Sequence, residues 1–189
     1  LCDHSDSMGA RDTGWVQLYA ETIQEAYDNA IQALRIAEHP DVMLPTMHCL
    51  DGFILGHSME RVEILPDEVV QQFIGKYKPG HSLLDVDRPV TYGPNDYHDY
   101  FFEHKRQQEE GMARALEVIP RIGKEYGDVT GRYYGLLDSY RLEDAQFVFL
   151  GMGSAMGTVR VVIDELRGSG YRLSDALVAE ILRRCGETH

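Results

Sequence analysis

The sequence predicts an α/β fold organised around a parallel β-sheet. Residues 16–20 alternate weakly in polarity, as a strand does, and an amphipathic helix is expected from Thr22 to about His39. The apolar run at 41–50 follows directly and favours a second strand, which completes a strand–helix–strand unit. A further strand, turn and helix are expected over 146–166. Because a crossover helix lets two strands run in the same direction, a parallel sheet is expected.

The first helix carries its own start and stop signals. Thr22 and Glu25 have the spacing of a capping box, in which side chains satisfy the first free amides of a helix. The helix is expected to end near His39-Pro40. Its apolar stripe is predicted as Ile23, Tyr27, Ala30, Leu34 and Ala37, and its solvent face as Gln24, Asp28, Gln32, Arg35 and Glu38.

The middle of the chain alternates helices with a turn-rich segment. A short extended piece is expected at 59–64, and a short helix should follow Pro66 and stop at Gly75. Residues 75–97 are rich in proline and glycine and are predicted to be an interdomain linker. A long helix is expected from Asp99 to about Tyr126, kinked or interrupted by Pro120.

The C-terminal part contains the strand 146–150, a glycine-rich turn, a helix, and a second helix from Ser174 that should close on Gly186. The turn reads Gly151-x-Gly153-x-x-x-Gly157, which has one residue too many between its last two glycines for a dinucleotide fingerprint. A tight structural turn and a nucleotide-binding turn are therefore both open, and the spacing favours the structural turn.

Composition excludes some classes of function. With 18 Lys and Arg against 31 Asp and Glu, the formal charge of −13 repels phosphate backbones, so no nucleic-acid partner is expected. The first twenty residues have no apolar signal region and no apolar run approaches a membrane span, so no membrane association is predicted. The same acidity suits an ordinary soluble enzyme.

Cysteine and histidine usage predicts no metal centre. The three cysteines, Cys2, Cys49 and Cys185, are far apart and form no zinc or iron–sulfur motif, and their small number indicates a reducing compartment, the cytoplasm. Among the eight histidines, His98 and His104 lie on different sides of their helix. His48 is interpreted as a satisfied core or edge histidine.

Two polar loops are candidates for a substrate pocket. Asp3, His4, Ser5 and Asp6 bring acid–base groups into one loop, although an Asx-type turn with a helix cap would use the same side chains. The second loop contains Asp51, Gly52 and His57 directly after the expected strand, where a structural Asp-Gly turn is the alternative. Ligands of open α/β sheets bind at the carboxyl ends of the strands, so both loops are expected to lie at one edge.

A series of motifs is dispersed along the chain between roughly residues 3 and 170. They are Asp3 to Gly14, Gln24-Glu25-Ala26, Leu44-Pro45, Asp51-Gly52-Phe53 to His57 and Glu60, Arg88-Pro89-Val90, Glu103-His104 with Arg106-Gln107-Gln108, Gly131-Arg132-Tyr133, and Gly153-Ser154-Ala155 with Asp164 to Arg167. In their order and spacing, these segments resemble the alpha chain of the thiamine-diphosphate-dependent 2-oxoacid:ferredoxin oxidoreductases.

The resemblance implies an organisation and an activity. Residues 1–74 would be the second half of a parallel-sheet pyrimidine-binding domain, 75–97 a linker, and 98–189 a transketolase-C-terminal-like α/β domain, either whole or incomplete. The implied reaction is oxidative decarboxylation of pyruvate or a related 2-oxoacid to acyl-coenzyme A with ferredoxin as electron acceptor. Thiamine diphosphate with magnesium would be shared with a partner chain. Beta, gamma and delta type subunits would be the partners and would hold the iron–sulfur clusters.

Two departures from the family limit what can be assigned. The family's catalytic glutamate lies upstream of any residue matched here, so the catalytic residue is unknown. Leu1 is not an initiator methionine, and the segment after Arg172 differs from the family, so we expect a fragment that has no turnover alone. The alternatives are a non-catalytic α/β subunit-docking module and a Rossmann-like nucleotide-binding protein.

Overall fold

The computed structural model describes residues 4–171 and 173–175. The first part of the chain contains α1 (Ser5–Gly9), the 3-10 turn η1 (Arg11–Thr13), β1 (Val16–Tyr19), α2 (Ile23–Ala37), β2 (Thr46–Cys49), α3 (Ile54–His57) and α4 (Asp67–Ile74). The second part contains α5 (Phe101–Thr130), β3 (Phe147–Phe149), α6 (Ala155–Gly168) and β4 (Leu173–Asp175). These elements confirm the predicted α/β class.

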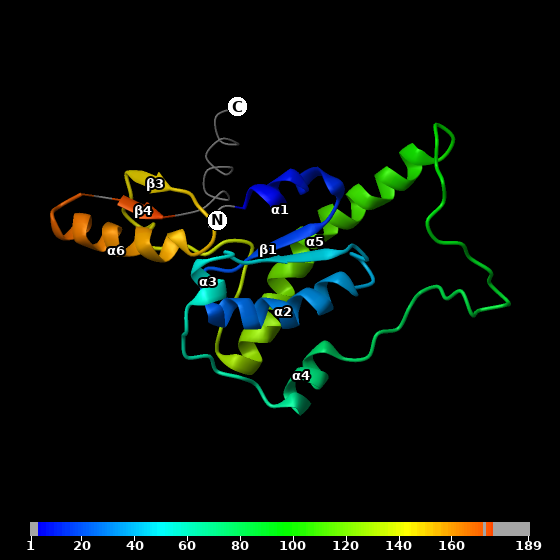
Figure 1. Ribbon diagram of the computed structural model, residues 1–189, viewed down its shortest axis with the longest axis horizontal. Coiled ribbons are helices and arrows are strands. Elements are labelled where there is room, and N and C mark those ends of the chain that lie inside the picture. Colours follow the sequence, from blue (N-terminus) through cyan, green and yellow to red (C-terminus); the bar gives the residue numbers. More distant parts are fainter. Residues whose placement is uncertain (1–3, 172, 176–189) are drawn as a thin grey trace.

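The described residues form two pairs of parallel strands. β1 pairs with β2 from Val16–Thr46 to Tyr19–Cys49, and β3 pairs with β4 from Phe147–Leu173 to Phe149–Asp175. In Figure 1 the β1–β2 pair lies between α1 and α2, whereas β3, β4 and α6 form a separate group at one end of the molecule. The predicted strand–helix–strand unit is confirmed, but the second strand is shorter than the expected 41–50. Met43 has a φ of 47°, which breaks the extended conformation before Thr46.

Helix α2 starts as predicted but buries a different face. Oγ1 of Thr22 accepts the amide of Glu25 at 3.1 Å, and the Glu25 carboxylate accepts the amide of Glu21 at 2.7 Å, one residue before the expected partner. The predicted solvent face was wrong for Asp28 and Gln32, which are buried, while Leu34 of the predicted apolar stripe is half exposed. Asp28 can be buried because distant side chains, above all Arg132, compensate its charge.

Helix α5 runs without interruption through Pro120 to Thr130 and ends at Gly131, whose φ is 76°. A proline inside a helix removes one backbone hydrogen bond. Here that loss is offset by the burial of Ala115, Val118, Ile122 and Tyr126 in the main hydrophobic core, as helical stability comes mostly from tertiary packing. The predicted continuation of the helix past Pro120 to about Tyr126 is confirmed, and the alternative of an interruption at Pro120 was wrong, whereas a kink there stays a prediction.

The main core joins segments on both sides of the predicted linker. Buried side chains of α5 pack with Val16, Ile31, Ile36 and Phe73 of the first part. Residues 75–100, which connect α4 to α5, contain neither helix nor strand and extend away from the other elements in Figure 1. Helix α5 thus shares the core of residues 16–74, although it follows the linker. The division into domains at 74 and 98 stays a prediction.

The end of the chain differs from the expected helix at its start. Leu173–Asp175 form β4, paired with β3, because a parallel partner is available across α6. Residues 176–189, on which the rest of the predicted helix falls, lie outside the described residues. None of the helices that the structure describes is both long and apolar enough to span a membrane.

Candidate functional site

His4 and Asp51 bring the two predicted loops into contact. His4 directly precedes α1, and one residue separates Asp51 from the end of β2. Nε2 of His4 lies 2.8 Å from Oδ1 of Asp51, and the two side chains are only 9% and 3% exposed. The ring of His4 also packs edge-on against Tyr19, at the end of β1, with ring centroids 4.8 Å apart. The junction therefore lies at the carboxyl ends of both paired strands, as the sequence predicts.

A third segment completes this junction. The amide of Ser154, at the N-terminus of α6, donates to Oδ2 of Asp51 at 2.8 Å. Gly153 has a φ of 72°, and a Cβ atom there would lie 2.6 Å from Nε2 of His4 and 2.8 Å from Oδ1 of Asp51. Only glycine suits this position, on grounds of both backbone conformation and space. The glycine-rich turn thus contacts a protein carboxylate.

Polar side chains of α1 and β1 continue from His4. Ser7 is buried, its hydroxyl lies 3.0 Å from that of Tyr19, and the Tyr19 hydroxyl donates to Gln17 at 2.8 Å. Burial raises the pKa of both the Tyr19 phenol and the Cys49 thiol above their ordinary values. Both groups are therefore neutral at pH 7, and Cys49 has no thiolate character that would make it a nucleophile.

The other predicted loop residues are less closely associated. Ser5, Asp6, Gly52 and His57 are exposed, and the Asp6 carboxylate accepts the amide of Ser7 at 2.7 Å. His57 stacks on Phe53, with ring centroids 5.0 Å apart. Asp3 lies outside the described residues. Of the seven predicted site residues, the structure brings His4 and Asp51 into direct contact. A role for any of the seven in a substrate pocket stays a prediction.

Sequence reasoning missed Ser7, Tyr19 and Ser154 as members of this group. Ser7 lies one position beyond the predicted loop, and Tyr19 reads as an ordinary strand residue. Ser154 carried a usable signal, because a glycine-rich turn at a helix start offers free amides to an anion. The sequence could not show that the anion is the side chain of Asp51, 103 residues away.

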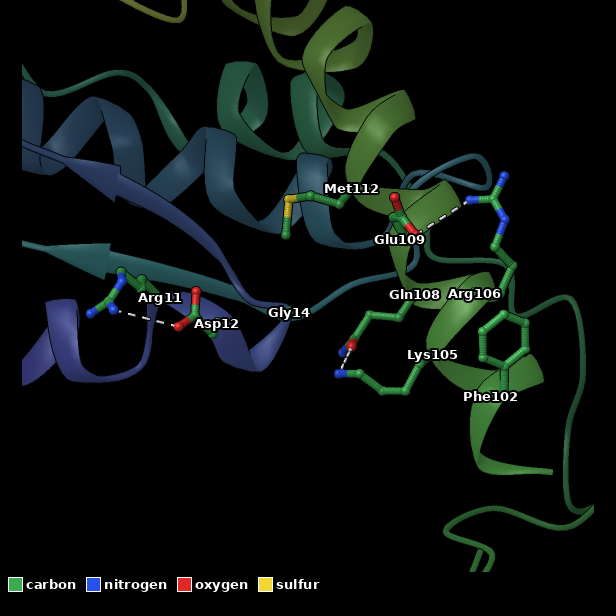
Figure 2. Close-up of a pocket in the computed structure, with 9 residues that line it drawn as sticks. All are labelled: Arg11, Asp12, Gly14, Phe102, Lys105, Arg106, Gln108, Glu109 and Met112. Carbon is green, nitrogen blue, oxygen red and sulfur yellow. Dashed lines mark hydrogen bonds and ion pairs between the residues drawn. The ribbon is translucent and has the colours of Figure 1, made fainter. Parts of the chain in front are cut away.

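A pocket of about 350 Å³ lies between η1 and the N-terminal half of α5. Figure 2 shows the side chain of Arg11 pointing away from α5 and that of Arg106 pointing away from η1. Each is paired with a nearby acid, Arg11 with Asp12 at 3.6 Å and Arg106 with Glu109 at 3.6 Å. Lys105, the third cationic side chain on the walls, donates to the neutral side chain of Gln108.

Metal ligands and isolated histidines add little to the site. Within 4–171 and 173–175, no three His, Cys, Asp or Glu side chains are grouped as a metal site would require. Burial lowers the pKa of His48, and its Nε2 has no hydrogen-bond partner among the described residues. His48 is thus a half-buried histidine of β2, and the prediction that its hydrogen bonding is satisfied was wrong for Nε2.

The part of the chain that contains the His4–Asp51 junction matches a known family. A family model described as pyruvate flavodoxin/ferredoxin oxidoreductase, thiamine diphosphate-binding, matches residues 1–124. The chain belongs to the pyruvate flavodoxin/ferredoxin oxidoreductase family. The match confirms the resemblance drawn from the dispersed motifs, and it includes His4, Asp51 and both strands of the first pair.

Curated members of the pyruvate flavodoxin/ferredoxin oxidoreductase family are similar over most of the chain. The pyruvate synthase subunit PorA of Thermotoga maritima is 54% identical over 91% of this chain and 44% of its own length. The PorA subunit of Methanocaldococcus jannaschii is 48% identical over 89% of this chain and 44% of its own length. The ketoisovalerate oxidoreductase subunit VorA of Pyrococcus horikoshii is 41% identical over 93% of this chain and 44% of its own length. The chain spans less than half the length of these relatives.

Proposed function

We propose that this chain is part of the alpha chain of a 2-oxoacid:ferredoxin oxidoreductase. The reaction is oxidative decarboxylation of pyruvate, or a related 2-oxoacid, to acyl-coenzyme A, with ferredoxin accepting the electrons. Family membership and the names of the relatives support this reaction class. The structural observation that carries the proposal is the contact between His4 and Asp51 at the carboxyl ends of β1 and β2.

The proposed cofactor is thiamine diphosphate with magnesium, shared with a partner chain. The side chains present fit one wall of a shared site, because no three His, Cys, Asp or Glu side chains among the described residues are grouped to hold the magnesium ion. When bound, thiamine diphosphate supplies the nucleophilic carbon for attack on a 2-oxo group. The exposed Ser5 and Asp6, next to the rigid His4–Asp51 contact, would face that shared site.

Beta, gamma and delta type subunits are the proposed partners, with iron–sulfur clusters in those subunits, and ferredoxin and coenzyme A as reactants. We place the complex in the cytoplasm, consistent with the sparse cysteines. The second half of the chain is proposed to begin a transketolase-C-terminal-like domain, which the parallel β3–β4 pair with α6 supports.

The rival nucleotide-binding function is disfavoured by one contact. A bound phosphate would need the free amides at the start of α6, but the amide of Ser154 already donates to the Asp51 carboxylate. That carboxylate would also repel a phosphate. A non-catalytic docking module is the remaining alternative.

The test is an assay of the assembled complex that contains the complete chain. We expect reduction of a viologen acceptor that depends on a 2-oxoacid, coenzyme A and thiamine diphosphate together. Pyruvate and 2-oxoisovalerate should be compared, because relatives carry names for both activities. Binding of partner subunits without turnover would support the docking module, and micromolar binding of NAD without turnover would support the nucleotide-binding alternative.

A further inference from the structure

Asp51 is one of four buried polar or charged residues described in the chain, with a relative exposure of 2%. A carboxylate that is removed from water must be paired or hydrogen-bonded, because desolvation otherwise costs more than the fold can supply. The partners of Asp51 must therefore come from the protein itself. They indicate what the carboxylate does besides the substrate-pocket role that the sequence predicts for it.

The two oxygens of Asp51 have different partners from distant parts of the chain. Oδ1 lies 2.8 Å from Nε2 of His4, and Oδ2 accepts the amide of Ser154 at 2.8 Å. The amide of Ser154 is one of the free backbone amides at the N-terminus of α6, where the helix dipole favours a negative charge. One carboxylate thus spans the loop before α1 and the turn before α6.

Close packing makes this arrangement rigid. Gly153 is buried, and any side chain at that position would overlap the nitrogen of His4 and the oxygen of Asp51. Helix α6 has a second attachment nearby, because Arg160 pairs with Glu21 at 3.2 Å, just after β1. A displacement of α6 would therefore move Asp51 and, through Asp51, the ring of His4.

We propose that Asp51 is a positioning residue that couples the orientation of His4 to the docking of the Gly153–Ser154 turn at the start of α6. The inference rests on the proposed function only for its effect on turnover. Oδ1 of Asp51 lies against Nε2 of His4 in a close contact without hydrogen-bond geometry, and Oδ2 is held by the amide of Ser154. Because a small misplacement of a site residue can lower a rate severely, Asp51 acts on the reaction without touching the substrate.

The experiment uses the assembled complex with the complete chain and four variants. Asp51→Asn keeps the shape of the side chain and removes its charge. His4→Phe keeps a ring against Tyr19 and removes the nitrogens. Ser154→Pro removes the amide donor, which the φ of −63° at Ser154 allows, and places the proline ring against Oδ2 of Asp51, so that the docking of the turn is broken. Glu117→Gln, on the exposed side of α5, is the matched control for loss of a carboxylate charge.

We expect Asp51→Asn to lower kcat for the oxoacid about tenfold or more, with a smaller change in KM, while Glu117→Gln stays at the wild-type value. In the His4→Phe background, Asp51→Asn should have little further effect, because both variants interrupt the same contact. A merely structural role for Asp51 would instead make the two losses multiply. Multiplicative losses, or a kcat for Asp51→Asn equal to that of Glu117→Gln, would overturn the proposal.

Amide hydrogen exchange separates this inference from the proposed function. Ser154→Pro should raise exchange in residues 4–10, which are distant in sequence but joined to the turn through Asp51. That measurement needs neither turnover nor the Asp51 variant. If the wild-type complex oxidises no 2-oxoacid, the proposed function fails while the coupling can still be read. Unchanged exchange in residues 4–10 would refute the coupling even in an active complex.

Discussion

Asp28, in the middle of α2, is a buried charge with a structural purpose. Its carboxylate accepts hydrogen bonds from Tyr126 and Tyr134, each at 2.6 Å, and from Nε and Nη2 of Arg132 at 2.6 and 3.0 Å. Burial raises the pKa of this carboxyl, but the hydrogen bonds from Arg132, Tyr126 and Tyr134 outweigh it, so the pKa lies below its ordinary value. The group fastens α2 to α5 and to the segment after α5.

We expect Asp28→Asn to lower the free energy of unfolding by about 3 kcal/mol at pH 7, because it leaves the guanidinium of Arg132 without its buried partner. Urea denaturation followed by circular dichroism measures the change. Tyr134→Phe, which removes one hydrogen bond from the same carboxylate, should cost about 1–3 kcal/mol. A loss for Asp28→Asn no larger than that for Glu117→Gln would contradict the assignment of Asp28 as a central structural group.

The same carboxylate predicts a pH dependence with a definite sign. Since its pKa is lower in the folded state, its contribution is complete above the unfolded pKa of about 3.9 and is lost as pH falls through the folded pKa. The difference in unfolding free energy between wild type and Asp28→Asn should therefore be constant from pH 7 to about 5 and shrink below about pH 4. Urea titrations at several pH values test this, and a difference that grows in acid would be incompatible with the prediction.

At the scale of elements, α2 depends on its N-terminal cap. Oγ1 of Thr22 accepts the amide of Glu25, which satisfies one of the free donors of the first turn. Replacing Thr22 with alanine should lower the free energy of unfolding by about 1 kcal/mol, whereas serine should retain the cap. Chemical denaturation of the two variants gives the comparison. Equal losses for alanine and serine would assign the effect to the methyl group and not to the hydrogen bond.

A glycine in helix α5 allows another segment of the chain to approach the helix closely. A Cβ atom on Gly123 would overlap the backbone carbonyl of Tyr134, which belongs to the segment that also bonds Asp28. Close approach of this segment thus requires the missing side chain. The alternative explanation, an accidental glycine in a long helix, predicts the opposite response to substitution.

Gly123→Ala should destabilise the protein by about 1–3 kcal/mol, because overpacking against a backbone atom forces a shift of the chain. In an open helical position the same change is favourable by up to about 1 kcal/mol. Gly168→Ala, at the end of α6 with nothing within 4 Å of the added atom, is the matched control. Thermal unfolding of both variants should show opposite signs, and a stabilised Gly123→Ala would exclude the proposed close approach.

At the scale of the whole molecule, two parallel strand pairs are linked through α5 and joined again at the Asp51 junction. The first pair contributes the carboxyl ends of β1 and β2, and the second contributes the start of α6. The proposed reaction also needs iron–sulfur clusters, and no three His, Cys, Asp or Glu side chains among the described residues are grouped as a metal site would require. The whole function is therefore expected to require partner subunits.

The isolated 189-residue chain should show no pyruvate-dependent reduction of viologen in the presence of coenzyme A and thiamine diphosphate. The complete complex, assayed in parallel, is the positive control. Measurable turnover by the isolated chain would show that it contains a complete active site, contrary to the prediction.

Much of the local structure was predictable from the sequence. The cap at Thr22, the order strand–helix–strand and the helix after the glycine-rich turn follow from hydrogen bonds and periodicities among residues a few positions apart. The dispersed motifs gave the family, and the polar loops gave His4 and Asp51 as site candidates. These features need no knowledge of distant contacts.

Long-range contacts decided the rest. Asp28 reads as a solvent-facing residue of α2 until Arg132 and two tyrosines are placed around it, and the contacts that His4 and Ser154 make with the buried Asp51 are not visible in the local sequence. The path of α5 through Pro120 likewise depends on the core that α5 enters. The reason is physical: the free energy of burying a charge or tolerating a proline is set by neighbours about 100 residues away, which local pattern does not reveal.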